Sequence, residues 1–287
     1  MNDIKLEVNN ISKTYVSSKG ESFRALKDVN LQVKDREFVA LLGPSGCGKT
    51  TLLKLIAGLI EPSSGEILLD GKKIRGPGAN RGMVFQKYSL FPWLNVWENI
   101  EFGLRLNGMP KEKRYELVEH YIRLIGLMGF ENAYPRELSG GMQQRVAIAR
   151  TMVTNPEILL MDEPFGALDT QTRSLMQELL LDVWEKDNKT VLFVTHDVEE
   201  AIFLADTIYV STAQPGTIKA KIDVRIPRPR TFETKTSRRF LKLNKQLREM
   251  IREESIKAMQ SRKRSEKTPA RNLNVMEIFR TAIYNLI

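Results

Sequence analysis

A glycine-rich loop that ends in Lys-Thr constrains the fold of this chain more than any other feature. An apolar run at 38–42 precedes the loop and predicts a buried strand, and residues 50–59 predict a helix with apolar side chains at helical spacing. In such a turn, backbone N–H groups surround phosphate oxygens at the positive end of the helix. The sequence therefore predicts an α/β fold organised around a bound nucleoside triphosphate.

Each residue type in this loop has a chemical reason to be there. Lys49 is expected to reach the β- and γ-phosphates of ATP, and the Thr50 hydroxyl to bind Mg2+. Cys47 is interpreted only as a small residue within the turn. A glycine-rich turn that binds nothing is disfavoured because Lys and Thr both follow in register. The residues expected to contact ATP here are Gly43, Pro44, Ser45, Gly46, Cys47, Gly48, Lys49, Thr50 and Thr51.

A second apolar run, residues 158–161, ends in two acidic residues. The carboxyl end of a core strand is where α/β folds place their ligand-binding groups. Phosphoryl transfer depends on placed charge, so we assign Asp162 to Mg2+ and Glu163 to the attacking water. The alternative is an acidic strand end turning into solvent, which the phosphate loop makes less attractive.

A further glycine turn lies at 138–144, with the sequence Leu-Ser-Gly-Gly-Met-Gln-Gln. Ser139 is a suitable cap for the helix that follows, and its free N–H groups would then face an anion. A plain capped helix explains Ser139 but not the paired Gly140 and Gly141. Two anion-binding turns in one chain suggest a nucleotide that is shared between two copies.

The phosphate loop and this signature turn together resemble the nucleotide-binding subunit of ATP-binding cassette (ABC) transporters. The resemblance covers about residues 4–232. It implies an ABC ATPase fold, a P-loop core with an antiparallel β edge subdomain and an inserted helical subdomain. It also implies a dimer that sandwiches two ATP molecules, in which Ser139, Gly140 and Gly141 bind the γ-phosphate held by the partner copy.

The same resemblance assigns four single residues. Gln86 is implied to contact the metal and the attacking water and to sense the membrane subunit. His196 is implied to be a switch that contacts the γ-phosphate, and Tyr15 to stack on adenine. Asp169 ends the segment 166–169, which resembles the short loop by which the two subunits signal across their interface, although Gly166 stands where the family more often has Ser. Without the resemblance, an ordinary polar or surface role would suffice for Gln86, His196 and Tyr15.

Composition restricts the class of protein. The 287 residues are 42% hydrophobic and 28% charged, which is ordinary for a globular chain. No apolar run approaches the roughly 20 residues of a membrane span, and the first residues lack the apolar core of a secretory signal. A single cysteine agrees with a reducing compartment. We therefore expect a protein of the cytoplasm, and the resemblance implies that it lies peripherally at the cytoplasmic face of the cell membrane.

The net charge of +9 is concentrated in the C-terminal part. Residues 1–216 hold 25 Lys and Arg against 28 Asp and Glu, whereas residues 217–287 hold 19 against 7. A nearly neutral core with a basic tail indicates an appendage with its own electrostatic partner rather than a nucleic-acid-binding protein. No nucleic acid is expected as a partner.

The order of patterns predicts the domain organisation. We expect an ABC domain over 1–232, with a hairpin that turns at Asp70-Gly71, and a helical subdomain inserted at about 87–155. Residues 233–287 form a basic helical extension: an amphipathic helix at 234–259 that packs back on the core, a linker at 261–269, and a short apolar stretch at 275–287.

The aromatic segment 88–97 opens the helical insertion. Phe91, Pro92 and Trp93 in succession cannot all point inward, which suggests a groove for a partner helix. The resemblance implies docking of a transmembrane permease subunit there. Core packing and partner docking are evenly balanced for Trp93, and packing is favoured for Trp97.

After Gly216 the chain resembles the nitrate, sulfonate and taurine importers, through residues 222–224 and the Pro-Arg run at 227–230. We expect the two arginines of this run to form a solvated exit from the domain. The resemblance implies uptake of a small anion or sulfonate such as nitrate, taurine or alkanesulfonate. It also implies an extracytoplasmic solute-binding protein as an indirect partner.

Two other functions stay open at this stage. A soluble ABC-type ATPase acting on nucleic acid or ribosomes would use the basic tail, but the chain has no long coiled-coil insertion and no second cassette. A non-catalytic scaffold would leave Glu163 and His196 idle. The importer ATPase is favoured by the aromatic segment and the importer-like run after Gly216.

Overall fold

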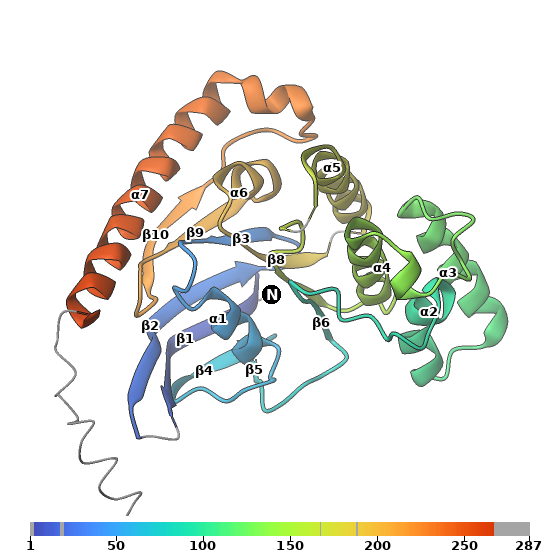
Figure 1. Ribbon diagram of the computed structural model, residues 1–287, viewed down its shortest axis with the longest axis horizontal. Coiled ribbons are helices and arrows are strands. Elements are labelled where there is room, and N and C mark those ends of the chain that lie inside the picture. The colour runs from blue at the N-terminus through green and yellow to red at the C-terminus, as the bar shows by residue number, and fades with distance from the viewer. Residues whose placement is uncertain (1–2, 18–19, 167, 188, 267–287) are drawn as a thin grey trace, which may run out of the picture.

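Two β-sheets and a separate helical lobe form the molecule (Figure 1). The computed structural model describes residues 3–17, 20–166, 168–187 and 189–266. The strands are β1 Ile4–Val16, β2 Ser22–Lys34, β3 Phe38–Leu42, β4 Ser64–Leu69, β5 Lys72–Lys73, β6 Arg81–Val84, β7 Ile158–Asp162, β8 Thr190–Thr195, β9 Thr207–Ser211 and β10 Ile218–Asp223. The helices are α1 Lys49–Ile56, α2 Val96–Leu106, α3 Lys111–Leu124, α4 Gly140–Met152, α5 Thr170–Asp187, α6 Val198–Leu204 and α7 Arg238–Glu266.

The larger sheet has the strand order β10-β9-β3-β8-β7-β6, with only β10 antiparallel to its neighbour. Strands β3, β7, β8 and β9 are buried along their whole length, because layers cover both faces of a parallel sheet. Along β3, Val39 and Leu41 join one apolar cluster while Phe38, Ala40 and Leu42 join the other. The parallel strands therefore end at one edge between two packed layers.

The smaller sheet is antiparallel, in the order β2-β1-β4-β5. Its β4–β5 hairpin turns at Asp70 and Gly71, which both have positive φ (49° and 71°), as a two-residue hairpin turn requires. This confirms the expected hairpin and the β edge subdomain. Helix α1 contributes Leu52, Leu53 and other apolar residues to the cluster beneath this sheet.

Helices α2, α3 and α4 form the lobe inserted between β6 and β7. Asn95 and Glu98 form a capping box at the start of α2, and α3 begins directly after Pro110. Trp97 is partly buried against this lobe, with its ring centre 4.7 Å from that of Tyr115, which confirms packing for Trp97. In the part of the chain that the structure describes, no helix combines the length and apolarity needed to cross a bilayer.

The C-terminal helix differs from its predicted bounds. It begins at Arg238, after a 3-10 turn at Phe232–Thr236, and continues to Glu266. The predicted linker at 261–269 is therefore wrong over its first six residues. Those residues include Arg, Lys and Glu, which favour helix, and no proline occurs between Arg238 and Pro269. Phe240 and Leu247 are fully buried, so the helix packs back as expected, while 275–287 lies outside the described residues.

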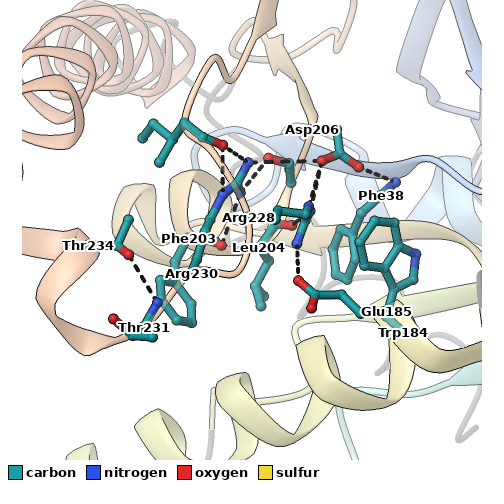
Figure 2. A network of polar contacts seen from close by, with 12 residues as sticks. Phe38, Trp184, Glu185, Phe203, Leu204, Asp206, Arg228, Arg230, Thr231 and Thr234 are labelled. Atoms are coloured by element: carbon teal, nitrogen blue, oxygen red, sulfur yellow. Dashed lines mark hydrogen bonds and ion pairs between the residues drawn. The ribbon is translucent and has the colours of Figure 1, made fainter.

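The arginines of the Pro-Arg run are not solvated, which corrects that expectation (Figure 2). The Arg230 side chain is only 1% exposed. Its Nη1 donates to the carbonyls of Ile202 (3.0 Å), Phe203 (3.1 Å) and Ala205 (2.8 Å). These carbonyls lie at the end of α6, where no helical N–H is available to bond them. Burial lowers the pKa of Arg230 to about 10, the nearby Arg228 charge adding to the effect.

Arg228 holds the same segment through a second set of contacts. Its guanidinium lies 4.1 Å from the centre of the Trp184 ring, and its Nη2 donates to Asp206 Oδ1 at 2.8 Å. The other carboxylate oxygen of Asp206 accepts from the N–H of Phe38 at 3.0 Å. The segment after β10 is thus fastened to the start of β3 and the end of α6.

Replacing Arg230 should destabilise the fold. Arg230→Ala leaves buried carbonyls without a donor, so we expect a loss of about 2–4 kcal/mol in the free energy of unfolding. Arg225→Ala is the matched control, since the Arg225 side chain is 89% exposed. Urea unfolding of both variants measures the difference; equal stability would contradict the anchoring role.

Candidate nucleotide site

The phosphate loop connects β3 to α1 and depends on two glycines in the left-handed region. Gly46 and Gly48 have φ of 82° and 98°. A Cβ at Gly48 would lie 2.8 Å from the carbonyl oxygen of Ala25 on β2. The close approach of β2 therefore leaves room only for glycine, and the loop wraps tightly around the start of α1.

Lys49 is the first residue of α1, and only 6% of its surface is exposed. Its Nζ donates to the carbonyls of Gly43 (2.8 Å) and Pro44 (3.0 Å) and lies 3.8 Å from Glu163 Oε1. The ammonium group is thereby held across the loop, next to the residue assigned to the attacking water.

Thr50 and Asp162 meet on the side of the loop that faces β7. The Thr50 hydroxyl donates to Asp162 Oδ1 at 3.0 Å. Burial raises the pKa of Asp162, the hydrogen bond from Thr50 opposes that shift, and the neighbouring Glu163 charge adds to it. A hydroxyl and a carboxylate are hard oxygen donors of the kind that Mg2+ prefers. Among the described residues, no group of three or more His, Cys, Asp or Glu side chains is arranged to hold a metal ion.

Glu163 lies at the centre of the predicted catalytic group. His196 Nδ1 is 3.0 Å from Glu163 Oε2, and Gln86 Nε2 donates to the same oxygen at 3.4 Å. These residues follow β7, β8 and β6, so three neighbouring strand ends supply them. Glu163 has a φ of 45°, unusual for a residue with a side chain, and its N–H donates to the carbonyl of Val194. The fold therefore brings together the three residues predicted for catalysis.

A pocket of about 310 Å³ lies over the loop and includes an aromatic residue that the sequence analysis missed. Tyr15 and Phe23 are cross-strand partners on β1 and β2, and both line this pocket. They are 40% and 51% exposed, and the stacking of adenine on Tyr15 stays a prediction. Tyr15 also lies 3.5 Å from Thr51 through their hydroxyls.

The signature turn lies at the start of α4, on the helical lobe. Ser139 Oγ accepts from the N–H of Met142 at 3.3 Å, which confirms the predicted cap. A Cβ at Gly140 would lie 2.5 Å from the Tyr88 hydroxyl. In Figure 1, α4 lies well apart from α1, and none of Ser139, Gly140 and Gly141 lines the pocket over the phosphate loop. Their contact with a partner's nucleotide stays a prediction.

Asp169 has a local structural role in this chain. Its Oδ1 accepts from the N–H groups of Gln171 (3.1 Å) and Thr172 (3.0 Å) at the start of α5. Hydrogen bonds from the Thr172 side chain and backbone lower the pKa of Asp169. The carboxylate stays exposed, and its signalling role between subunits stays a prediction.

Known proteins match the chain over most of its length. The ABC transporter family matches residues 26–166. The nitrate import ATP-binding protein of Synechocystis sp. is 47% identical, over 86% of this chain and 95% of the relative. The taurine import ATP-binding protein of Pelagibacter ubique is 50% identical, over 73% and 79%. The aliphatic sulfonates import ATP-binding protein of Bacillus cereus is 45% identical, over 84% and 94%.

A solved structure shares the fold. A dimeric ATP-binding cassette in a post-hydrolysis state, bound to ADP and phosphate, is 37% identical with a TM-score of 0.70. The match covers 77% of this chain and 99% of that chain. These matches show that the chain belongs to the ABC transporter family as an ATP-binding, ATP-hydrolysing subunit.

Proposed function

We propose that this chain energises a membrane importer for a small anion or sulfonate such as nitrate, taurine or an alkanesulfonate. One observation supports ATP hydrolysis by this chain more than any other. Glu163 lies within reach of His196, Gln86 and Lys49, beside the Thr50–Asp162 pair. A scaffold protein would have no need to collect these groups, whereas ATP hydrolysis requires them.

Each of these residues has its own role in the hydrolysis of ATP. Glu163 accepts a proton from water as the water oxygen bonds to the γ-phosphorus, and the bond to the β–γ bridging oxygen breaks to leave ADP. Lys49 and His196 hold the γ-phosphate oxygens, and Gln86 orients the water. Mg2+, when bound, neutralises charge on the β- and γ-phosphates. Thr50, Asp162 and Gln86 would hold it.

The active form is a pair of chains. The first N–H groups of α4 and the Ser139 side chain that caps this helix form a site for an anion. None of Ser139, Gly140 and Gly141 lines the pocket over the phosphate loop of the same chain. A nucleotide bound by a second copy supplies the anion if the phosphate loop of that copy faces this turn. Ser139, Gly140 and Gly141 then contact the γ-phosphate across the interface, with Asp169 near the same boundary.

A permease subunit docks on the aromatic segment. Phe91 packs its ring 4.5 Å from Phe102 and 5.6 Å from Trp93, and the Arg150 guanidinium lies 5.2 Å from the Phe91 ring centre. Trp93 remains 68% exposed and Pro92 is exposed. An exposed indole supported by an ordered aromatic cluster suits the apolar face of a partner helix. Docking of this kind would hold the chain at the cytoplasmic face of the cell membrane as a peripheral subunit, which is the localisation we propose.

The transported anion is inferred from the relatives that carry nitrate, taurine and sulfonate import in their names. An extracytoplasmic solute-binding protein would select it, so its contact with this chain is indirect. The ABC domain at 1–232, with its insertion at about 87–155, and the extension at 233–287 remain our proposed division.

The first experiment compares ATP hydrolysis by the purified chain alone, with membranes that contain its permease subunits, and with DNA or RNA. We expect the permease membranes to change the rate and nucleic acids to leave it unchanged. Stimulation by nucleic acid alone would overturn the importer proposal in favour of a nucleic-acid ATPase.

Glu163→Gln should separate ATP binding from hydrolysis. The amide keeps the size of the side chain but accepts no proton, so we expect hydrolysis to fall by at least about 100-fold. ATP should then hold the dimer closed, as measured by light scattering with and without ATP. A variant that stays monomeric and hydrolyses ATP at the normal rate would contradict the assignment.

Ser139→Arg tests the shared site. The bulky cation blocks the signature turn, so hydrolysis should be lost while ATP binding by the same chain is retained, measured by calorimetry. Arg136→Ser is a control on the neighbouring exposed surface and should leave both unchanged. Loss of ATP binding in Ser139→Arg would argue that the turn belongs to its own chain's site.

A further inference from the structure

The C-terminal helix α7 extends to the back of the phosphate loop. It runs along the edge strand β10 (Figure 1). Near its end, Ala258 lines a small cavity of about 40 Å³ together with loop residues from Pro44 to Cys47. Ala213 and Gln214 line the same cavity. These two residues belong to the turn 212–217 between β9 and β10, which we call the back turn.

Glu254 of α7 holds the back turn. It is 1% exposed, and its carboxylate accepts from the N–H of Ala213 and from Nζ of Lys219 and Lys257, each at 2.9 Å. Burial acts to raise the pKa of Glu254, but the hydrogen bonds from Lys219, Lys257 and Ala213 outweigh it and lower the pKa to about 2. The carboxylate therefore stays ionised near neutral pH, and charge-assisted bonds fix the turn to α7.

The back turn also contacts the phosphate loop. Within it, the Thr212 N–H donates to the Thr217 carbonyl at 2.9 Å. Gly216 donates its N–H to the carbonyl of Ala25 at 2.9 Å, and a Cβ at Gly216 would lie only 2.0 Å from the carbonyl oxygen of Cys47. With backbone in direct contact with backbone, the Cys47 peptide cannot move back unless the turn moves too.

We propose that Glu254 is a positioning residue for ATP binding. Through Ala213 and the back turn it fixes the Cys47 peptide, and so keeps the N–H groups of the phosphate loop aimed at the phosphates. Glu254 touches no nucleotide itself. Its loss therefore weakens ATP binding and leaves the hydrolytic group around Glu163 intact.

Glu254→Gln in the full chain tests this proposal. We expect the Kd for ATP, measured by calorimetry, and the KM for ATP hydrolysis to rise at least about fivefold. The kcat at saturating ATP should stay within about twofold, because the groups on β7 and β8 are unchanged. Glu253→Gln is the matched control: it loses the same charge and a bond to Lys219 at 2.8 Å, but it is exposed and has no bond to the back turn.

Gly216→Ala provides an independent test that leaves the α7 contacts in place. The added methyl group pushes on the Cys47 carbonyl, so KM and Kd should rise as in Glu254→Gln. Gly76→Ala is its control, because a Cβ there meets no atom within 4 Å. If Glu254→Gln keeps the native unfolding midpoint and an unchanged Kd, or if Gly216→Ala does so, the proposal is overturned.

A fall in kcat with an unchanged KM would overturn it as well, since the effect would then lie on the hydrolytic group. Should Glu254→Gln fail to fold, Gly216→Ala decides the question. ATP binding by the unsubstituted chain, measured in parallel, keeps a failure of the nucleotide assignment distinguishable from a failure of the positioning role.

Discussion

The site depends on the fully buried, parallel packing of β3, β7 and β8, because this packing fixes where the strands end. The loop leaves β3, Asp162 and Glu163 end β7, and His196 follows β8. A shift of one strand by one residue would move its end by about 3.3 Å and exchange its two faces. The hydrogen-bond distances around Glu163 tolerate no such shift, so the two apolar clusters on either side of the sheet maintain the catalytic geometry.

The residues at this edge of the sheet could be predicted from the sequence because the phosphate loop, the two acidic residues and His196 each follow an apolar run. Parallel strands end at the same edge of a sheet, so side chains that follow them lie close together. Phe23 was missed for a physical reason. Its place beside Tyr15 depends on the pairing register of β1 and β2, which contains several irregularities that no side-chain pattern reveals. The burial of Arg230 was not predicted because its partners are backbone carbonyls. Every residue has a carbonyl, so no sequence pattern marks such a partner. The end of α7 was missed because a basic run was given more weight than helix propensity.

A short route connects the proposed docking surface to the hydrolytic group. Gln86 follows β6 and contacts Glu163, and the aromatic segment begins two residues later. Within this segment, the N–H of Phe91 donates to the buried Asn99 side chain at 3.0 Å, which ties the segment to α2. A displacement of the helical lobe by a partner would therefore be transmitted to Gln86 over a few residues. The same displacement would carry the signature turn on α4, so the proposed docking would be coupled to the proposed closing of two copies on ATP.

The basic C-terminal part has a different meaning once its contacts are known. Part of its positive charge is engaged within the chain: Arg228 pairs with Asp206, Lys219 and Lys257 pair with Glu254, and Arg248 pairs with Glu199. Arg230 bonds backbone carbonyls. These engaged cations fasten the C-terminal part, including the helix α7, along the edge of the nucleotide-binding core.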